Sequence, residues 1–344
     1  MMNLSELTAV IQRNCHISDA QYAGNYSLCI FLLKMREYFR WEQQTPLTRE
    51  LHKPAVSEWL QQREQLWDSL EQEPYQNLRL GKQHYDPFDS DPINAVLNPQ
   101  GYVYSSGYGV FGKPHFFLGK LKRKMIQNGL TVYISSEEYA RDLVAPPAMS
   151  LNNQVFIRQE SLRRFIWQKI EEWQWKKDSN HPMAKAIAFI DAPDMEQVLD
   201  RLCENESENV LLHEVGETEV GQMVGQAWKD MLQQIPHSGA ELQIRAVRDH
   251  LADCISTLPS LVNSGNELSL HFYFANFTGM RKQLFPGALQ AYRSWLQSGD
   301  TQALDRCVQQ GRRHWEQTVH GLLAAFKTHG SNITQRTDEL IQAI

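Results

Sequence analysis

The sequence predicts a mainly helical α+β protein, in which a multi-helix bundle carries a small antiparallel β-sheet insertion. Apolar residues recur at helical spacing through residues 1–75 and again over residues 158–344. Residues 76–157 instead hold short β-branched or aromatic runs separated by turn residues. The repeated strand–helix alternation of a doubly wound α/β fold is absent. We therefore expect the helices of 158–344 to pack with those of 1–75 as one body, with 76–157 as the insertion.

The first third of the chain predicts two long helices. One covers residues 25–44, where no Gly or Pro interrupts a helically spaced apolar stripe, and Pro46 ends the pattern. The next lies in "KPAVSEWLQQREQLWDSLEQE", with Pro54 placed as a helix starter.

The insertion predicts strands in "YVYSSGYG", "HFFLGKL" and "TVYISS", after a loop-rich stretch, "HYDPFDSDPINAVLNPQG". We expect "SSEEYARDL" to form a short helix with Ser135 or Ser136 as its N-cap, ended by Pro146 and Pro147.

Helices follow to the end of the chain. "DAPDMEQVLDRLCE" and "SENVLLHEVGETEVGQMVGQAWKDMLQQI" predict two of them, and Gly221 and Gly225 predict close helix packing. Ser238 and Glu241 have the spacing of a capping box at the start of another helix.

Composition narrows the functional classes. The formal net charge is −6 and the pI is near 6.1, which argues against a nucleic-acid or anionic-membrane partner. The N-terminus lacks a secretory pattern, and the longest strongly apolar run is far shorter than the ~20 residues that span a bilayer. Five scattered cysteines fit reduced thiols, so we expect a cytoplasmic protein.

A glycine pattern, G-x-G-x-x-G, occupies residues 107–112. A dinucleotide site needs a helix directly after the glycines, whereas "KPHFFLGKL" follows here. The kinase version needs companion motifs that the chain lacks. The glycines therefore predict the turn of a β-hairpin. If His115 beside it packs toward His213 and Glu217, the loop is a wall or lid of their site; if His115 points to solvent, the glycines serve only the turn.

His213 and Glu217 predict a metal site, because they lie one turn apart and extend the apolar stripe of their helix. A buried carboxylate needs a cation, a metal or a shared proton. His250 and Asp253, on the next helix, are expected as further ligands or as their supporting groups. The leading hypothesis is thus a metal-dependent enzyme, an oxidase or a hydrolase, with divalent iron, manganese or zinc between the helices.

Other residues complete that hypothesis. Glu37 is a candidate bridging carboxylate, and Asp249 lies beside the predicted ligands. Arg245 or Arg248 is expected to hold a small anionic substrate.

The alternative hypothesis is a non-catalytic partner-binding or assembly protein with a buried structural polar network. In that case His213 is a hydrogen-bonded core histidine, and Asp249 and Asp253 pair with arginines. The sequence decides neither the oligomeric state nor the substrate.

Three stretches, "GYGVFGKPHFFL", "YARDLVAPPAM" and "HEVGE…RAVRDHLADCISTLP", together resemble an uncharacterised family of bacterial cytosolic proteins. The resemblance covers most of the chain. It implies a bacterial origin and a single family over the whole chain, and it implies no activity and no catalytic residues.

Overall fold

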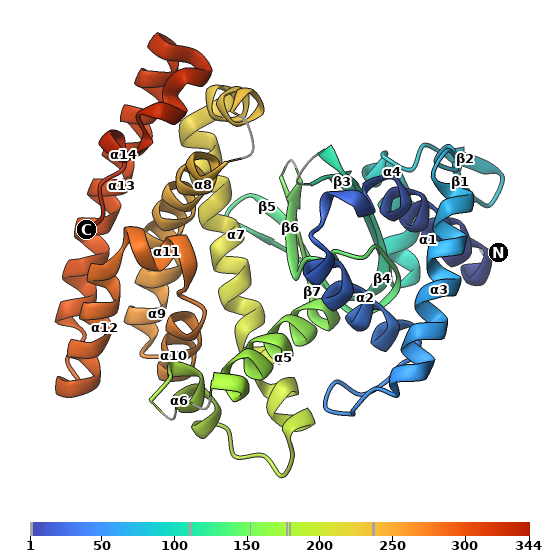
Figure 1. Cartoon of the computed structure of the whole chain (residues 1–344), viewed down its shortest axis with the longest axis horizontal. Helices are drawn as coiled ribbons and strands as arrows, with labels where there is room; N and C mark the ends of the chain where they lie inside the picture. The colour runs from blue at the N-terminus through green and yellow to red at the C-terminus, as the bar shows by residue number, and fades with distance from the viewer. Residues whose placement is uncertain (1–2, 110–111, 152, 177, 179, 236–237) are drawn as a thin grey trace. The chain divides into compact units, whose positions relative to one another are not determined.

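The structure is a computed structural model that describes residues 3–109, 112–151, 153–176, 178, 180–235 and 238–344. The chain divides into two compact units. Unit 1 consists of residues 1–168 and 192–204, and unit 2 of residues 169–191 and 205–344. Unit 1 combines helices with a sheet and unit 2 is helical, so the predicted mainly helical α+β class is confirmed (Figure 1). None of the described helices is long and apolar enough to cross a bilayer.

The helices of unit 1 differ in how they begin. They are α1 (Leu4–Tyr22), α2 (Leu28–Glu42), α3 (Lys53–Leu70), α4 (Ser90–Leu97) and the greater part of α5 (Gln159–Lys176). Asn3 caps α1, since its side-chain oxygen accepts from the N–H groups of Ser5 and Glu6. Pro54 lies in the first turn of α3, as predicted. Helix α4 was expected to be loop; it forms because Ile93 and Leu97, four residues apart, are both buried.

The main sheet of unit 1 has five strands in the order β3-β4-β5-β7-β6. They are β3 (Tyr102–Tyr108), β4 (Pro114–Gln127), β5 (Leu130–Arg141), β6 (Ala148–Leu151) and β7 (Gln154–Arg158), and β1 (Leu78–Leu80) and β2 (Gln83–Tyr85) form a separate hairpin. The prediction of a purely antiparallel sheet is wrong, because β5 and β7 are parallel. After β5 the chain first forms β6 at the edge of the sheet. It then turns back as β7, which lies between β6 and β5.

Strand β5 also replaces the short helix predicted from "SSEEYARDL". It pairs with β4 as far as Arg141. The helix prediction rested on an N-cap at Ser135 or Ser136 and on the two prolines as its end. Instead, Glu138 and Arg141 are buried, and the Glu138 carboxylate forms ion pairs with the buried Arg158 and Arg164. A charged residue of a strand tolerates burial when a counter-ion meets it there.

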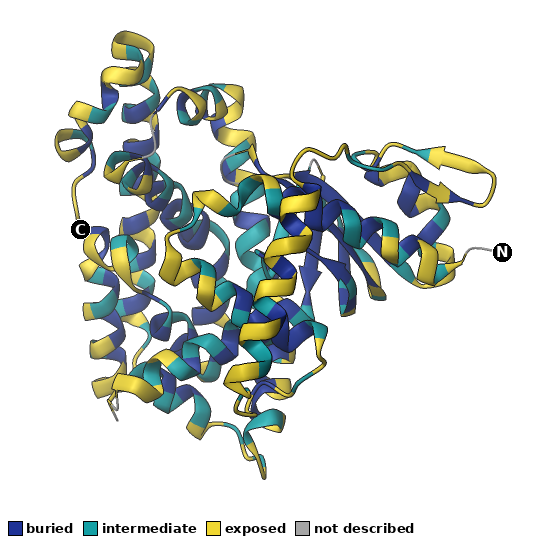
Figure 2. Ribbon diagram, turned by 45° about the vertical axis from the view of Figure 1, so that its right-hand side comes forward, coloured by how far each residue is buried: buried dark blue, intermediate teal, exposed yellow. Residues whose placement is uncertain are grey.

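Two apolar clusters position the site in unit 1. Helix α1 packs against β4 and β5, with Leu7, Ile11 and Cys15 buried beside Phe116 and Leu118. Helices α2 and α3 share a second cluster, which includes the following aromatic and apolar residues: Met35, Tyr38, Phe39, Trp41, Trp59, Trp67 and Leu143. Strands β3, β5 and β7 and the first half of β4 are mostly buried, whereas β2 and the second half of β4 are largely exposed and the helices keep exposed faces (Figure 2).

Unit 2 is built from helices around a large apolar core. Its elements are α6 (Pro182–Ala188), the greater part of α7 (Met195–Gln234), α8 (Gly239–Ala252), α9 (Leu258–Ser264), α10 (Glu267–Ala275), α11 (Gly279–Leu284), α12 (Pro286–Ser298), α13 (Gln302–His329) and α14 (Thr337–Leu340). A π-helical turn, Asp253–Thr257, joins α8 to α9. The Ser238 hydroxyl accepts from the Glu241 N–H, as a capping box requires.

Helix α7 combines the two helices predicted between residues 191 and 235. A single non-helical residue, Gly225, interrupts it with φ 64° and ψ −157°. The close packing predicted for Gly221 and Gly225 is wrong, since a Cβ at either would meet nothing within 4 Å. Close packing occurs at Gly216, where a Cβ would lie 2.5 Å from the Ala252 carbonyl oxygen. Gly225 instead supplies a positive φ.

Candidate functional site

His213 of unit 2 lies between two carboxylates. Its Nδ1 is 2.8 Å from Asp253 Oδ1, and its Nε2 is 3.3 Å from Glu217 Oε1. Asp253 also accepts from the Tyr273 hydroxyl at 2.8 Å and pairs with Arg281. The structure therefore brings together three of the predicted ligands, His213, Glu217 and Asp253.

The electrostatics of this group favour an imidazolium. Burial opposes a charge on His213, but Asp253 and Glu217 outweigh it and raise the pKa of His213 well above its ordinary value. Without a metal, the protonated ring can donate to both carboxylates. Among the described residues, no group of three or more His, Cys, Asp and Glu side chains is arranged to hold a metal ion.

The arginines predicted to hold an anion have partners in unit 2. Arg248 pairs with Glu217, and Arg245 Nη2 lies 2.7 Å from Glu241 Oε1. Asp249 is half-buried beside this group. Burial, followed by the negative charge of Glu217, raises the pKa of Asp249 to about 6.

His250 does not join His213. It is fully buried, and its ring stacks on Trp315 with a centroid separation of 5.0 Å. Its Nε2 lies 3.1 Å from the Arg281 carbonyl oxygen, so that nitrogen carries the proton in the neutral ring. Burial, and then the charge of Arg281, lowers the pKa of His250 to about 4. His250 is thus a neutral core histidine.

His115 belongs to unit 1, where it packs against the glycine loop. A Cβ on Gly109 would lie 2.2 Å from His115 Nε2, so the glycine leaves room for the ring. His115 Nδ1 pairs with the buried Asp142 carboxylate, which also accepts from Ala145 N at 2.8 Å. Burial opposes the charge of Asp142, but Lys113 and His115 outweigh it and hold the pKa of Asp142 well below its ordinary value. Two residues of the predicted loop, 110 and 111, lie outside the described part of the chain.

Glu37 also belongs to unit 1, and it lines a cavity of about 240 Å³. We call this the Arg141 cavity. Its walls come from α2, α5, the end of β5 and the segment that follows β5. They consist of Lys34, Glu37, Arg141, Leu143, Val144, Ala145, Pro146, Pro147, Ser161, Arg164, Phe165 and Gln168. Ala145 has φ 41°, an uncommon conformation for a residue with a side chain, and such strain often occurs at ligand sites.

Arg141 is buried without a counter-ion of its own. It is 2% exposed, and its Nε donates to the Asp142 carbonyl oxygen at 3.1 Å. Nη1 has no hydrogen-bond partner among the described residues, and Arg141 takes part in none of their ion pairs. The guanidinium lies over the rings of Tyr38 and Trp41, 5.4 Å from each centroid. Burial, and then the positive charge of Arg164, lowers the pKa of Arg141 to about 10.

Glu138, a buried carboxylate whose charge acts on Arg141, is engaged by other arginines. Its Oε2 lies 2.9 Å from Arg158 Nη2 and 3.0 Å from Arg164 Nη2. Burial opposes the charge of Glu138, but Arg158 and Arg164 outweigh it and lower the pKa of Glu138 to about 2. Lys34 adds a further cation to the cavity wall, and it too has no ion pair among the described residues. The cavity wall therefore carries an excess of positive charge.

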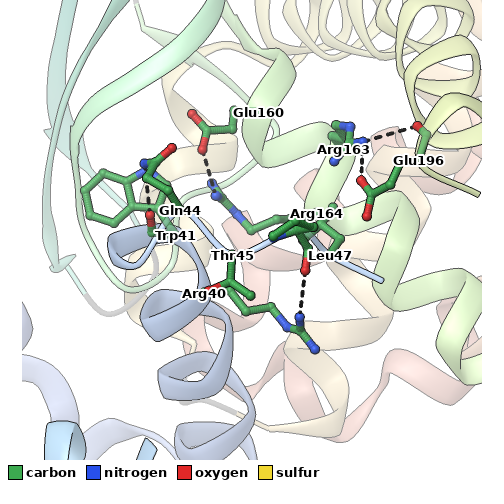
Figure 3. A pocket seen from close by; sticks show the side chains of 10 residues that line it. Arg40, Trp41, Gln44, Thr45, Leu47, Glu160, Arg163, Arg164 and Glu196 are labelled. Carbon is green, nitrogen blue, oxygen red and sulfur yellow. Dashed lines mark hydrogen bonds and ion pairs between the residues drawn. The ribbon is translucent and has the colours of Figure 1, made fainter. Parts of the chain in front are cut away.

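A second cavity of about 250 Å³, which shares Arg164, provides a contrast (Figure 3). There the cations have protein partners. Arg163 lies 2.6 Å from Glu196 Oε2, and Arg164 lies 3.3 Å from Glu160 Oε1. Arg40 donates to the carbonyl oxygens of Pro46 and Arg49.

Sequence reasoning missed Arg141, Lys34 and Arg164. Arg141 lies within the segment predicted as a short helix, and its burial follows only once β5 is recognised as a strand. One local signal for its burial was available. Arg141 and Asp142 directly precede "LVAPPAM", an apolar stretch with two prolines that forms part of the cavity wall.

The fold and the cavity define a mainly helical chain with a mixed sheet and a buried arginine pocket in its N-terminal unit. The N-terminal domain of a family of unknown function, DUF6866, matches residues 6–158, and the C-terminal domain of the same family matches residues 163–344. The chain therefore belongs to the DUF6866 family, which confirms the resemblance to an uncharacterised family over the whole chain. No curated protein and no solved structure matches the chain.

Proposed function

We propose that unit 1 binds a small molecule with a carboxylate or phosphate group in the Arg141 cavity. The observation that carries the proposal is the buried Arg141 guanidinium without a counter-ion. A buried unpaired charge is strongly unfavourable, and an anion in the cavity relieves it. Guanidinium groups bind carboxylates and phosphates through two parallel hydrogen bonds. A volume of about 240 Å³ is below the roughly 300–1,000 Å³ of pockets for drug-sized ligands, which favours a metabolite of a few heavy atoms.

Calorimetric titration tests this proposal with acetate, butyrate and inorganic phosphate, at constant ionic strength and with chloride as the reference. We expect saturable binding of at least one of these anions to the wild type. The Arg141→Met variant should weaken it at least about tenfold, which corresponds to about 1.4 kcal/mol for one lost charge-assisted contact. Met fills a similar apolar volume without a charge, so this variant should not melt below the ligand-free wild type.

Arg123→Gln is the matched control, because Arg123 is exposed on β4 and remote from the cavity walls. It removes one positive charge from unit 1 and should leave the anion affinity unchanged. Absence of saturable binding to the wild type would overturn the proposal. Equal losses in Arg141→Met and Arg123→Gln would also overturn it, because they would indicate a general charge effect.

For the cluster around His213 in unit 2 we propose a structural role, in line with the alternative of a buried polar network. Its support is the pairing of His213 with Asp253 and Glu217, and of the latter with Arg248. Metal analysis of the purified protein, alone and with His213→Ala or Glu217→Ala, tests this role. A metal that co-purifies with the wild type and is lost in both variants would restore the metal-enzyme hypothesis.

A further inference from the structure

The Arg141 cavity holds a second unsatisfied group, of opposite sign. Glu37 is 3% exposed, and its Oε2 has no hydrogen-bond partner among the described residues. Its other oxygen, Oε1, lies 2.8 Å from Arg36 Nε and 3.5 Å from Arg40 Nε. One face of this carboxylate is thus held by the protein, while the other lacks the donor that a buried oxygen requires.

We infer that the ligand is a small zwitterion, with its anionic group at Arg141 and an ammonium group at Glu37 Oε2. This inference rests on the proposed function, since it assigns the second end of the same ligand. An ammonium provides three donors and a positive charge, so it satisfies the unpartnered oxygen better than water does. An anion without an amine satisfies Arg141 and leaves Glu37 Oε2 unsatisfied.

The remaining walls are consistent with a short aliphatic connector between the two charged ends. Leu143, Val144, Pro146, Pro147 and Phe165 give one part of the cavity an apolar surface. Ser161 and Gln168 add neutral polar groups. The ligand class is therefore an aliphatic amino acid whose amine and acid lie at opposite ends of the chain.

The experiment compares three series of matched chain length by calorimetry. The first is glycine, β-alanine, 4-aminobutyrate and 5-aminopentanoate. The second is the carboxylates without the amine, and the third is the corresponding alkylamines. In the wild type we expect one amino acid to bind at least about tenfold more tightly than its carboxylate, and the alkylamines to bind more weakly than either, because the cavity wall has an excess of positive charge.

Variants then separate the two ends of the ligand. Glu37→Gln should reduce the preference for the amino acid to below about threefold and leave carboxylate binding within about threefold, which also shows that the variant folds. Glu37→Asp withdraws the carboxylate by one methylene, so the preferred amino acid should become one methylene longer. The control is Glu58→Gln, since Glu58 is exposed on α3.

The outcomes distinguish this inference from the proposed function. Equal binding of amino acids and carboxylates to the wild type overturns the zwitterion and leaves the anion site intact. Failure of both series to bind overturns both. Loss of the amino-acid preference in Glu58→Gln as well as in Glu37→Gln also overturns the zwitterion, because the effect would then not depend on Glu37.

Discussion

The substitution Glu206→Gln in unit 2 is expected to stabilise the protein at pH 8 and to have almost no effect at pH 5. Glu206 is 3% exposed on α7 and accepts three hydrogen bonds. The donors are Asn205 Nδ2 at 2.8 Å, Asn209 Nδ2 at 2.9 Å and Ser269 Oγ at 2.9 Å. These donors are neutral, so they compensate only part of the cost of burying a carboxylate.

The magnitude follows from the pKa of Glu206. Burial raises this pKa from 4.5 to about 7, against the opposing effect of the three hydrogen bonds. The unfolded chain therefore releases the proton first, and folding stability falls as the pH rises from about 4.5 through 7. The full loss is about 3 kcal/mol. Gln is always neutral, but its amide replaces one acceptor with a donor, which costs about 1 kcal/mol. The net gain is about 2 kcal/mol at pH 8 and close to zero at pH 5.

Urea unfolding at the two pH values measures this difference, with hydrogen–deuterium exchange of α10 peptides as a readout specific to unit 2. The control is Glu208→Gln, since Glu208 is exposed two residues further along α7. A gain of the same size at both pH values would refute the reasoning, because it would show that packing rather than ionisation is responsible. Absence of any gain at pH 8 would refute it as well.

Three further outcomes follow from the geometry. Asp249→Asn should add about 1–2 kcal/mol of stability at pH 8 and nothing at pH 4, because the pKa of Asp249 is raised to about 6; a gain at pH 4 would contradict this. Gly109→Ala should lower the stability by about 1–3 kcal/mol through its collision with the His115 ring, and the loss should nearly vanish in a His115→Ala background, as a double-mutant cycle of melting curves would show. Asp253→Asn should cost about 3–5 kcal/mol and lower the pKa of His213 in an NMR titration, since it removes a buried counter-ion; an unchanged His213 titration would contradict the assigned pairing.

Much of the helical structure could be predicted because its signals are local. In the helix predicted over residues 25–44, Met35, Tyr38 and Phe39 of the apolar stripe are buried, whereas Leu28 at its start is exposed. Pro54 and Ser238 mark helix starts through rules that act within one turn. The proximity of His213 and Glu217 is equally local, since residues four apart on a helix are neighbours.

Strand β5 and the charge state of His213 could not be predicted, because they depend on contacts between residues that are distant in the sequence. "SSEEYARDL" forms a strand because β4 and β7 supply its hydrogen bonds and Arg158 supplies a counter-ion for Glu138. The hydrophobic pattern of these nine residues gives no information about partners that lie elsewhere in the chain. The protonation of His213 likewise depends on Asp253, forty residues away. The spacing of His213 and Glu217 is the same for a metal ligand and for an ion-paired imidazolium, and it contains no information about partners such as Asp253.

The polar group around His213 and the Arg141 cavity differ in how their charges are balanced, and this difference supports the ligand site proposed in unit 1. In the group around His213, both Arg248 and Arg281 face a carboxylate, so an added ion would have to displace a partner. In unit 1, Arg158 and Arg164 share Glu138, and Arg141 has no ion pair among the described residues. Binding to the folded state alone adds stability, about 2.7 kcal/mol at a ligand concentration of 100 Kd. The melting temperature of the wild type should therefore exceed that of Arg141→Met only when ligand is present. Without an anion, the buried unpaired guanidinium lowers the stability of the wild type.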